Sequence, residues 1–359
     1  MSRAGQWFLQ SGIQEESGGV ARYYLADVQR NKPVSTEITG YAASTFVYLH
    51  SLTRDGVYLE RAVRAARFLT RTAWRADLAA IPFETEPTHE GLLVYFFDAG
   101  IIVRGLLAVW RGTGDDEFLR GAQAVGRSMM DDFAAGGGEH HPILRLPEKQ
   151  PLARDERWSR SPGCYQLKSA MAWHDLAEAT GEAAWRCPYD AALEFALAGS
   201  GAFLPGHPDR HKVMDRLHAY LYFLEGLLPR ARDPRCAAAL DAGIRRAAGY
   251  LRDIAPEFER SDVYAQLLRV RLYADWEGAV PLDLPAAEFE AARLRGFQHV
   301  CDGSRPPDPR LEGGFTFGRK GGECLPFLNP VSTGFALQAL ALWEQARAGG
   351  GQAHRHLLI

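Results

Sequence analysis

Thr36-Glu37-Ile38-Thr39-Gly40-Tyr41 is the stretch that decides the fold, because segments of the same kind recur along the chain. Each copy places acidic or hydroxyl side chains and a small residue in front of an apolar run at helical spacing. Further copies begin at Phe97-Asp98-Ala99-Gly100 and at Asn329-Pro330-Val331-Ser332-Thr333-Gly334. A unit that recurs about every 45 to 70 residues is typical of a helical repeat.

Each copy is followed by a short break and a second helical pattern. Thr53-Arg54-Asp55-Gly56 precedes an apolar periodicity over residues 57–74, and Gly112-Thr113-Gly114-Asp115 precedes one over 116–133. The units are therefore predicted to be helical hairpins. Further hairpins are expected to begin near Tyr165, near Asp215 and His218, and at Ser261. The last unit offers a single helix over residues 332–347.

The unmatched last helix has a candidate partner at the other end of the chain. Residues 3–11 can form a helix that has no hairpin mate of its own. If these two helices pair, the repeat closes into a ring of six inner and six outer helices and covers its own terminal faces. The sequence predicts an all-α fold, an (α/α)6 toroid, as a single domain over residues 1–359.

The connections between hairpins are much longer than the breaks within them. Long segments rich in glycine, proline and aromatic residues cover residues 10–35, 75–95, 134–163 and 300–330. Loops of this length are usually functional, so we expect the active rim of the ring on their side. The paired glycines Gly18-Gly19 and Gly313-Gly314, each followed by apolar residues, predict short β-ribbons in two of these loops.

The composition restricts the class of protein and its partners. Of 359 residues, 47% are hydrophobic and 24% are charged, as in soluble globular proteins. A net charge of -3 without a long basic run argues against nucleic acid as a partner. No secretory signal and no membrane-spanning run is recognisable, so no membrane insertion is expected. The cysteines are few and scattered, which favours a reducing cytoplasm: Cys164, Cys187, Cys236, Cys301 and Cys324. The oligomeric state stays open.

Carboxylates at the starts of the inner helices are the main catalytic candidates. Glu37 and Asp98 each lie next to a small residue and within hydrophobic sequence. Paired carboxylates can divide the roles of proton donor and of base or nucleophile in glycoside cleavage. Asp262 and His218 are expected to assist them. The alternative is structural, because acidic residues also stabilise the first turn of a helix.

A second set of residues is predicted to contact a substrate. Arginines suit the carboxylate of an acidic sugar, and aromatic rings suit its apolar face, although aromatic residues in helical rings are often core residues. The predicted substrate-binding residues are Arg22, Tyr41, Trp158, Arg160, Tyr165, Tyr264, Gln266 and Glu312.

Metal and cofactor chemistry receives little support from the sequence. His207, His211, Asp215 and His218 have helical spacing, but Pro208 interrupts the first interval, and we predict no metal site. The chain lacks GxxxxGK[ST], GxSxG and HExxH motifs, and its doubled glycines do not match a dinucleotide fingerprint. No cofactor is expected.

Residues 36–41, 97–100 and 112–115 together resemble the six-hairpin glycosidase-like superfamily. More narrowly, the chain resembles toroid proteins associated with bacterial polysaccharide biosynthesis and, distantly, the helical domain of glucuronyl C5-epimerases. The resemblance covers nearly the whole chain. It implies a carbohydrate-binding cleft at the loop-bearing rim and a chemistry among hydrolysis, elimination and epimerisation.

The leading hypothesis is an enzyme that acts on a polysaccharide or oligosaccharide with acidic sugars, and hydrolysis is slightly favoured over lyase or C5-epimerase chemistry. The alternative is a noncatalytic glycan-binding or scaffold protein of a polysaccharide biosynthesis system. A terpenoid-cyclase-like enzyme is a third candidate, because that fold is also a double ring of helices. The sequence has no DxDD or DDxxD run to support this third candidate.

Overall fold

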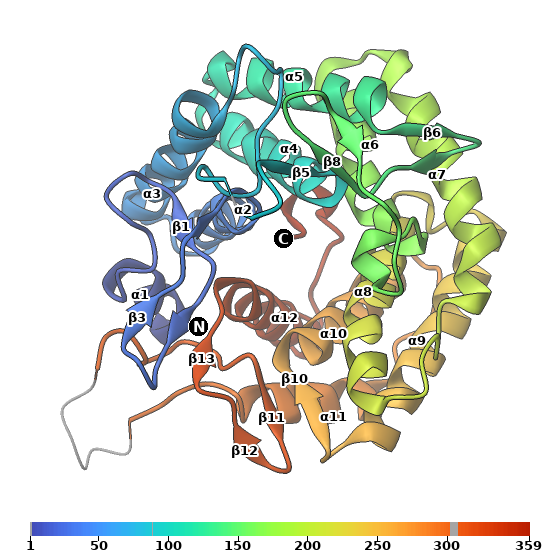
Figure 1. The fold of residues 1–359 in the computed structure, drawn as a ribbon. Coiled ribbons are helices and arrows are strands. Elements are labelled where there is room, and N and C mark those ends of the chain that lie inside the picture. Colours follow the sequence, from blue (N-terminus) through green and yellow to red (C-terminus); the bar gives the residue numbers. More distant parts are fainter. Residues whose placement is uncertain (1, 88, 302–307) are drawn as a thin grey trace. The chain divides into compact units, whose positions relative to one another are not determined.

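The computed structural model describes residues 2–87, 89–301 and 308–359 (Figure 1). Residues 302–307, within the expected loop 300–330, lie outside the described residues. The chain forms two compact units. The first unit contains Met1–Ile13, Arg22–Lys32 and Gly201–Arg355, and the second contains Gln14–Ala21, Pro33–Ser200 and His356–Ile359.

The second unit contains three helical hairpins, which confirms the predicted pairing. Its helices are α2 (Thr36–Thr53), α3 (Gly56–Arg67), α4 (Phe96–Thr113), α5 (Asp116–Asp132), α6 (Leu167–Thr180) and α7 (Arg186–Gly199). Helix α2 packs on α3, α4 on α5, and α6 on α7. The first helix of each hairpin ends at a residue in the left-handed conformation, namely Arg54, Gly114 or Gly181. This conformation stops a helix and turns the chain within a few residues.

The first unit contains the remaining described helices: α1 (Ser2–Gln10), α8 (Arg210–Leu227), α9 (Pro234–Ile254), α10 (Ser261–Trp276), α11 (Leu284–Arg295) and α12 (Pro330–Arg347). Helix α1 contacts α12. One predicted start is wrong, because α8 begins at Arg210 and not near Asp215. The side chain of Asp209 caps α8 by accepting a hydrogen bond from His211 N at 2.8 Å. His218 therefore lies inside the helix.

Short antiparallel strands in the loops confirm the predicted β-ribbons. In the first unit, β2 (Tyr24–Leu25) pairs with β3 (Arg30–Asn31) and β13 (Phe327–Leu328), and β11 (Gly318–Lys320) pairs with β10 (Phe258–Arg260) and β12 (Glu323–Cys324). In the second unit, the pairs are β1 (Val20–Ala21) with β4 (Val34–Ser35), β8 (Ile143–Arg145) with β5 (Leu93–Tyr95) and β9 (Gln150–Pro151), and β6 (Ala134–Gly136) with β7 (Glu139–His140). Several strands pair between different loops, as β5 does with β8, so the loops brace one another.

Glycines set the close packing of α2, α4 and α6 in the second unit. A Cβ atom added to Gly40 would lie 3.1 Å from the carbonyl oxygen of Ile101, and one added to Gly105 would lie 2.5 Å from the carbonyl oxygen of Gly40. A Cβ atom added to Gly100 would lie 2.5 Å from the Cα of Ser169. These contacts involve backbone atoms of Gly40, Gly100, Ile101 and Ser169 in the first two turns and of Gly105 in the middle of α4, so the N-terminal halves of neighbouring helices meet.

Replacement of Gly100 by Ala tests this packing. The added methyl group must push α4 and α6 apart, and we expect the unfolding free energy to fall by about 1–3 kcal/mol. Gly249 in α9 is the matched control, because a Cβ atom there would meet nothing within 4 Å. Gly249→Ala should raise the stability by about 0.5–1 kcal/mol, since it removes only backbone freedom. Thermal unfolding of both variants measures the contrast; equal shifts would contradict it.

Candidate functional site

Glu37 and Asp98 lie in the first turns of α2 and α4, about one turn before the contact of Gly40 with Ile101. Neither residue is the N-cap. Ser35 caps α2 through its side chain, and Tyr95 occupies the N-cap position of α4 without a capping hydrogen bond from its side chain. Asp98 is buried, with 6% of its surface exposed, and Glu37 is half-buried. Two carboxylates are thus placed at the touching ends of neighbouring helices.

Aromatic residues that precede α6 lie beside Asp98. The hydroxyl of Ser169 donates a hydrogen bond to Phe97 O at 2.8 Å and ties α6 to the first turn of α4. Tyr165 lies one turn before Ser169, in the 3-10 helix η3 (Cys164–Gln166). Burial, with smaller contributions from Cys164 and Asp98, raises the pKa of Tyr165, so its hydroxyl stays protonated. Trp158 packs edge-on against Tyr165 at 5.0 Å between ring centroids.

Arg160 is engaged by carboxylates of the protein itself. Its Nη2 donates to Glu90 Oε2 at 2.5 Å, and its Nε lies 3.7 Å from Asp155 Oδ2. The hydrogen bond from Arg160 lowers the pKa of Glu90. A substrate carboxylate that binds Arg160 must therefore compete with Glu90, a partner that the sequence did not single out.

In the first unit, Arg260 joins two aspartates. Its Nη2 donates to Asp262 Oδ2 at 2.6 Å, its Nε donates to Asp262 Oδ1 at 3.0 Å, and its Nη1 donates to Asp215 Oδ1 at 2.8 Å. The guanidinium also stacks on the ring of Phe317 at 4.4 Å. Helix α10 begins at Ser261 with Arg260 as its N-cap, so the alternative interpretation of Asp262 as an N-cap is wrong. Sequence reasoning missed Arg260, although it stands two residues before a helix-start aspartate.

His218 is held at one ring nitrogen by residues of α10. Its Nδ1 lies 2.7 Å from Gln266 Oε1 and 3.4 Å from Asp262 Oδ2, and its ring meets Tyr222 edge-on at 4.5 Å. Burial lowers the pKa of His218 to about 4, with Arg260 acting in the same direction and Asp262 opposing them. The imidazole is therefore neutral at pH 7. Because Gln266 Oε1 can only accept, Nδ1 carries the proton and Nε2 keeps its lone pair.

The other predicted binding residues are mostly buried or bonded to other residues of the protein. Tyr41 and Tyr264 are 2% and 1% exposed, so neither offers an open ring face, and the Tyr264 hydroxyl donates to Glu259 Oε1 at 2.9 Å. Gln266 is fully buried, and its Nε2 makes no hydrogen bond to any described residue. Glu312 accepts a hydrogen bond from Cys301 N at 2.7 Å and lies 3.5 Å from Arg3 Nη1. Arg22 is half-buried just before β2.

Potential metal ligands gather at one place in the described part of the chain. His174, Asp175 and Glu178 lie within 4.8 Å of one another. Asp175, however, accepts a hydrogen bond from Arg104 Nε at 2.8 Å, and both side chains are buried. Since a guanidinium already occupies this carboxylate, the cluster is better explained as an ion-pair network. The helical row of His207, His211, Asp215 and His218 considered above is not formed, because His207 precedes α8.

Within the described residues, no helix combines the length and the apolar character that crossing a membrane requires. All five cysteines carry free thiols.

Comparison with known proteins relates this chain to sugar-processing enzymes through its fold. No sequence-family model and no curated protein matches the chain. A sugar epimerase from a ruminal bacterium superposes with a TM-score of 0.66 at 11% identity, covering 94% of this chain and 95% of the epimerase. Cellobiose 2-epimerase from Spirochaeta thermophila gives 0.63 at 15% identity, with 95% and 94% covered. An unsaturated glucuronyl hydrolase from Streptococcus agalactiae gives 0.64 at 10% identity, with 96% and 91% covered.

These similarities cover nearly the whole chain at low identity, and they show the fold. The chain has the all-α, (α/α)6 toroid fold, which confirms the fold class predicted from the sequence.

The environment of His218 predicts a pH dependence of stability. An unfolded histidine has a pKa near 6.5, whereas folded His218 has one of about 4, so the unfolded chain binds more protons between these values. The contribution is present above about pH 6.5 and is lost as the pH falls toward 4. His218→Asn should flatten the rise of unfolding free energy over this window, by at most about 1.4 kcal/mol per pKa unit. Denaturant titrations across the window measure it.

His89→Asn is the parallel control for the loss of an exposed imidazole. An unchanged slope in His218→Asn would show that His218 titrates alike in the folded and unfolded chains.

Proposed function

We propose that this protein is a carbohydrate-active enzyme that acts on an oligosaccharide or polysaccharide with acidic sugars through proton transfer by carboxyl groups. The observation that carries the proposal is the position of Glu37 and Asp98 at the touching N-terminal ends of α2 and α4. Neither carboxylate is the N-cap residue of its helix. The fold shared with solved sugar epimerases and a glucuronyl hydrolase supports a sugar substrate.

Hydrolysis is the reaction that this carboxylate pair suits best. Asp98 is the more deeply buried of the two, and we assign it the role of proton donor to the glycosidic oxygen. Glu37 is half-exposed and can act as the base that activates water or as the nucleophile. Tyr165 beside Asp98 stays protonated, and its hydroxyl donates a hydrogen bond to Ser161 O at 3.1 Å, which fixes the ring next to this carboxylate.

Epimerisation is a second candidate, because His218 has the features of a proton carrier. The neutral ring is oriented by Gln266 through Nδ1, so Nε2 can remove a proton from a carbon next to a carbonyl or carboxylate group. Inversion then requires a second acid that delivers a proton to the opposite face of that carbon. The nearby Arg260 is held by two aspartates, which balance its positive charge beside the ring.

Incubation with glucuronate-containing oligosaccharides in isotopically labelled water separates these reactions. Hydrolysis transfers oxygen from water to a new reducing end. Epimerisation places deuterium on carbon without changing the chain length, and a lyase reaction creates a carbon–carbon double bond that absorbs ultraviolet light. Binding without any of these changes would favour the noncatalytic glycan-binding or scaffold alternative and reject the enzyme proposal.

Replacement of Glu37 by Gln tests the carboxylate mechanism. Loss of one acid–base group is expected to lower kcat by about 10²–10⁴-fold while substrate binding persists. Asp98→Asn should have an effect of the same order. Asp131→Asn is the matched control, because Asp131 is an exposed carboxylate at the end of α5. Initial rates and binding constants for the three variants provide the measurement, and full activity in Glu37→Gln would remove this residue from the mechanism.

A further inference from the structure

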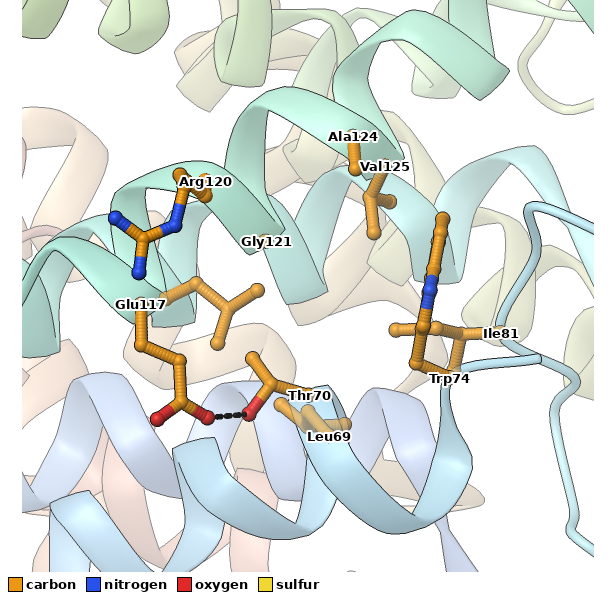
Figure 2. Close-up of a pocket in the computed structure, with 10 residues that line it drawn as sticks. Leu69, Thr70, Trp74, Ile81, Glu117, Arg120, Gly121, Ala124 and Val125 are labelled. Atoms are coloured by element: carbon orange, nitrogen blue, oxygen red, sulfur yellow. Dashed lines mark hydrogen bonds between the residues drawn. The ribbon is translucent and has the colours of Figure 1, made fainter. Parts of the chain in front are cut away.

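A separate cavity lies between η1 (Phe68–Ala73), which continues α3, and α5 in the second unit (Figure 2). Its volume is about 230 Å³. The lining side chains are mainly apolar with a polar group at one end: Leu69, Thr70, Trp74, Ile81, Leu106, Glu117, Arg120, Gly121, Ala124 and Val125. Glu37, Asp98 and Tyr165 are not among them, so the cavity is distinct from the carboxylate site.

Two local features keep this cavity open. The segment η1 is a π-helix, which is wider than an α-helix and is frequent at functional sites. On the facing helix, Gly121 leaves space, because a Cβ atom there would lie 3.0 Å from Thr70 Cγ2. Figure 2 shows the indole of Trp74 edge-on, with one ring face turned toward the space between Thr70 and Val125. The cavity thus has a flat aromatic wall.

The polar end of the cavity carries a fixed carboxylate. Glu117 accepts hydrogen bonds from Thr70 Oγ1 at 2.7 Å, from Arg71 Nε at 2.9 Å and from Arg71 Nη2 at 2.5 Å. The hydrogen bond from Arg71 lowers the pKa of Glu117 to about 2, so the group stays ionised. Its charge is matched by Arg71, and its remaining acceptor capacity suits a ligand hydroxyl.

Arg120 is the second charged group in the lining. It is exposed, and no hydrogen bond or ion pair joins it to any of the residues that the structure describes. Figure 2 shows its guanidinium at the same end of the cavity as Glu117. A cation with five donors and no protein counterion favours an anionic partner, and a carboxylate can bind it in a bidentate manner.

We propose that this cavity binds one acidic sugar ring, a uronic acid. The apolar face of the ring lies on Trp74, its hydroxyl groups donate to Glu117, and its carboxylate binds Arg120. An aromatic wall beside a hydroxyl acceptor and an unpaired guanidinium matches each part of such a sugar. The cavity is smaller than the roughly 300–1,000 Å³ of drug-sized sites, so it encloses a single ring and not a chain.

Calorimetric titration with glucuronic acid tests this site, with glucose as the neutral comparison. We expect Arg120→Gln to weaken glucuronate binding about 10- to 100-fold, as for the loss of a hydrogen-bonded charge pair. Arg127→Gln is the matched control, since Arg127 is exposed on the same helix and outside the cavity. Ala124→Leu, which fills the cavity, should abolish binding and serves as a second variant if Arg120→Gln folds poorly.

Titration of the Glu37→Gln variant separates this site from the proposed catalytic site. Glucuronate binding at the cavity should persist in Glu37→Gln, whether or not turnover is observed in the wild-type protein. Binding that is equal in Arg120→Gln and wild-type protein, or equal for glucose and glucuronate, would overturn the proposal.

Discussion

Close backbone contact at glycines is the constraint on which the arrangement of the second unit depends. Where Gly40 meets Ile101 and Gly100 meets Ser169, no side chain separates the helices. Helices packed through glycine approach to the short end of the usual range of about 8–10 Å between axes. Because Gly40 and Ile101 lie one turn after Glu37 and Asp98, their contact draws the helix starts together. The same small residues that allow the packing therefore also gather the polar side chains.

In the first unit, buried charged side chains align neighbouring helices and bring their polar groups together. Asp262, Gln266 and Arg269 are spaced by four and three residues, so they share one face of α10. His218 and Glu225 lie seven residues apart on α8 and meet this face, His218 at Gln266 and Glu225 at Arg269 Nη2 at 2.5 Å. Loss of one partner of such a buried pair costs about 3–5 kcal/mol. The pairs fix the register of α8 against α10, and the orientation of His218 follows from that register.

The sequence predicts the hairpins well because the information is local. Helical periodicity, short breaks and glycines next to acidic residues are all visible within windows of about 20 residues. Side-chain partners are harder to predict from the sequence. The hydrogen bond between His218 and Gln266, for example, joins residues 48 positions apart and depends on helix packing. The start of α8 could have been predicted from the sequence, because Asp209 follows Pro208 and is a good capping residue. The π-helix at Phe68–Ala73 could not have been predicted, because its composition is that of an ordinary helix.

The division into two units does not follow the order of the sequence. Residues 14–21 and 33–200 belong to the second unit, residues 22–32 and 201–355 to the first, and residues 356–359 again to the second. No single cut in the chain yields either unit with all of its parts. Each unit can be completed only after distant segments of the polypeptide have been synthesised. Folding of the two units is consequently coupled by chain connectivity.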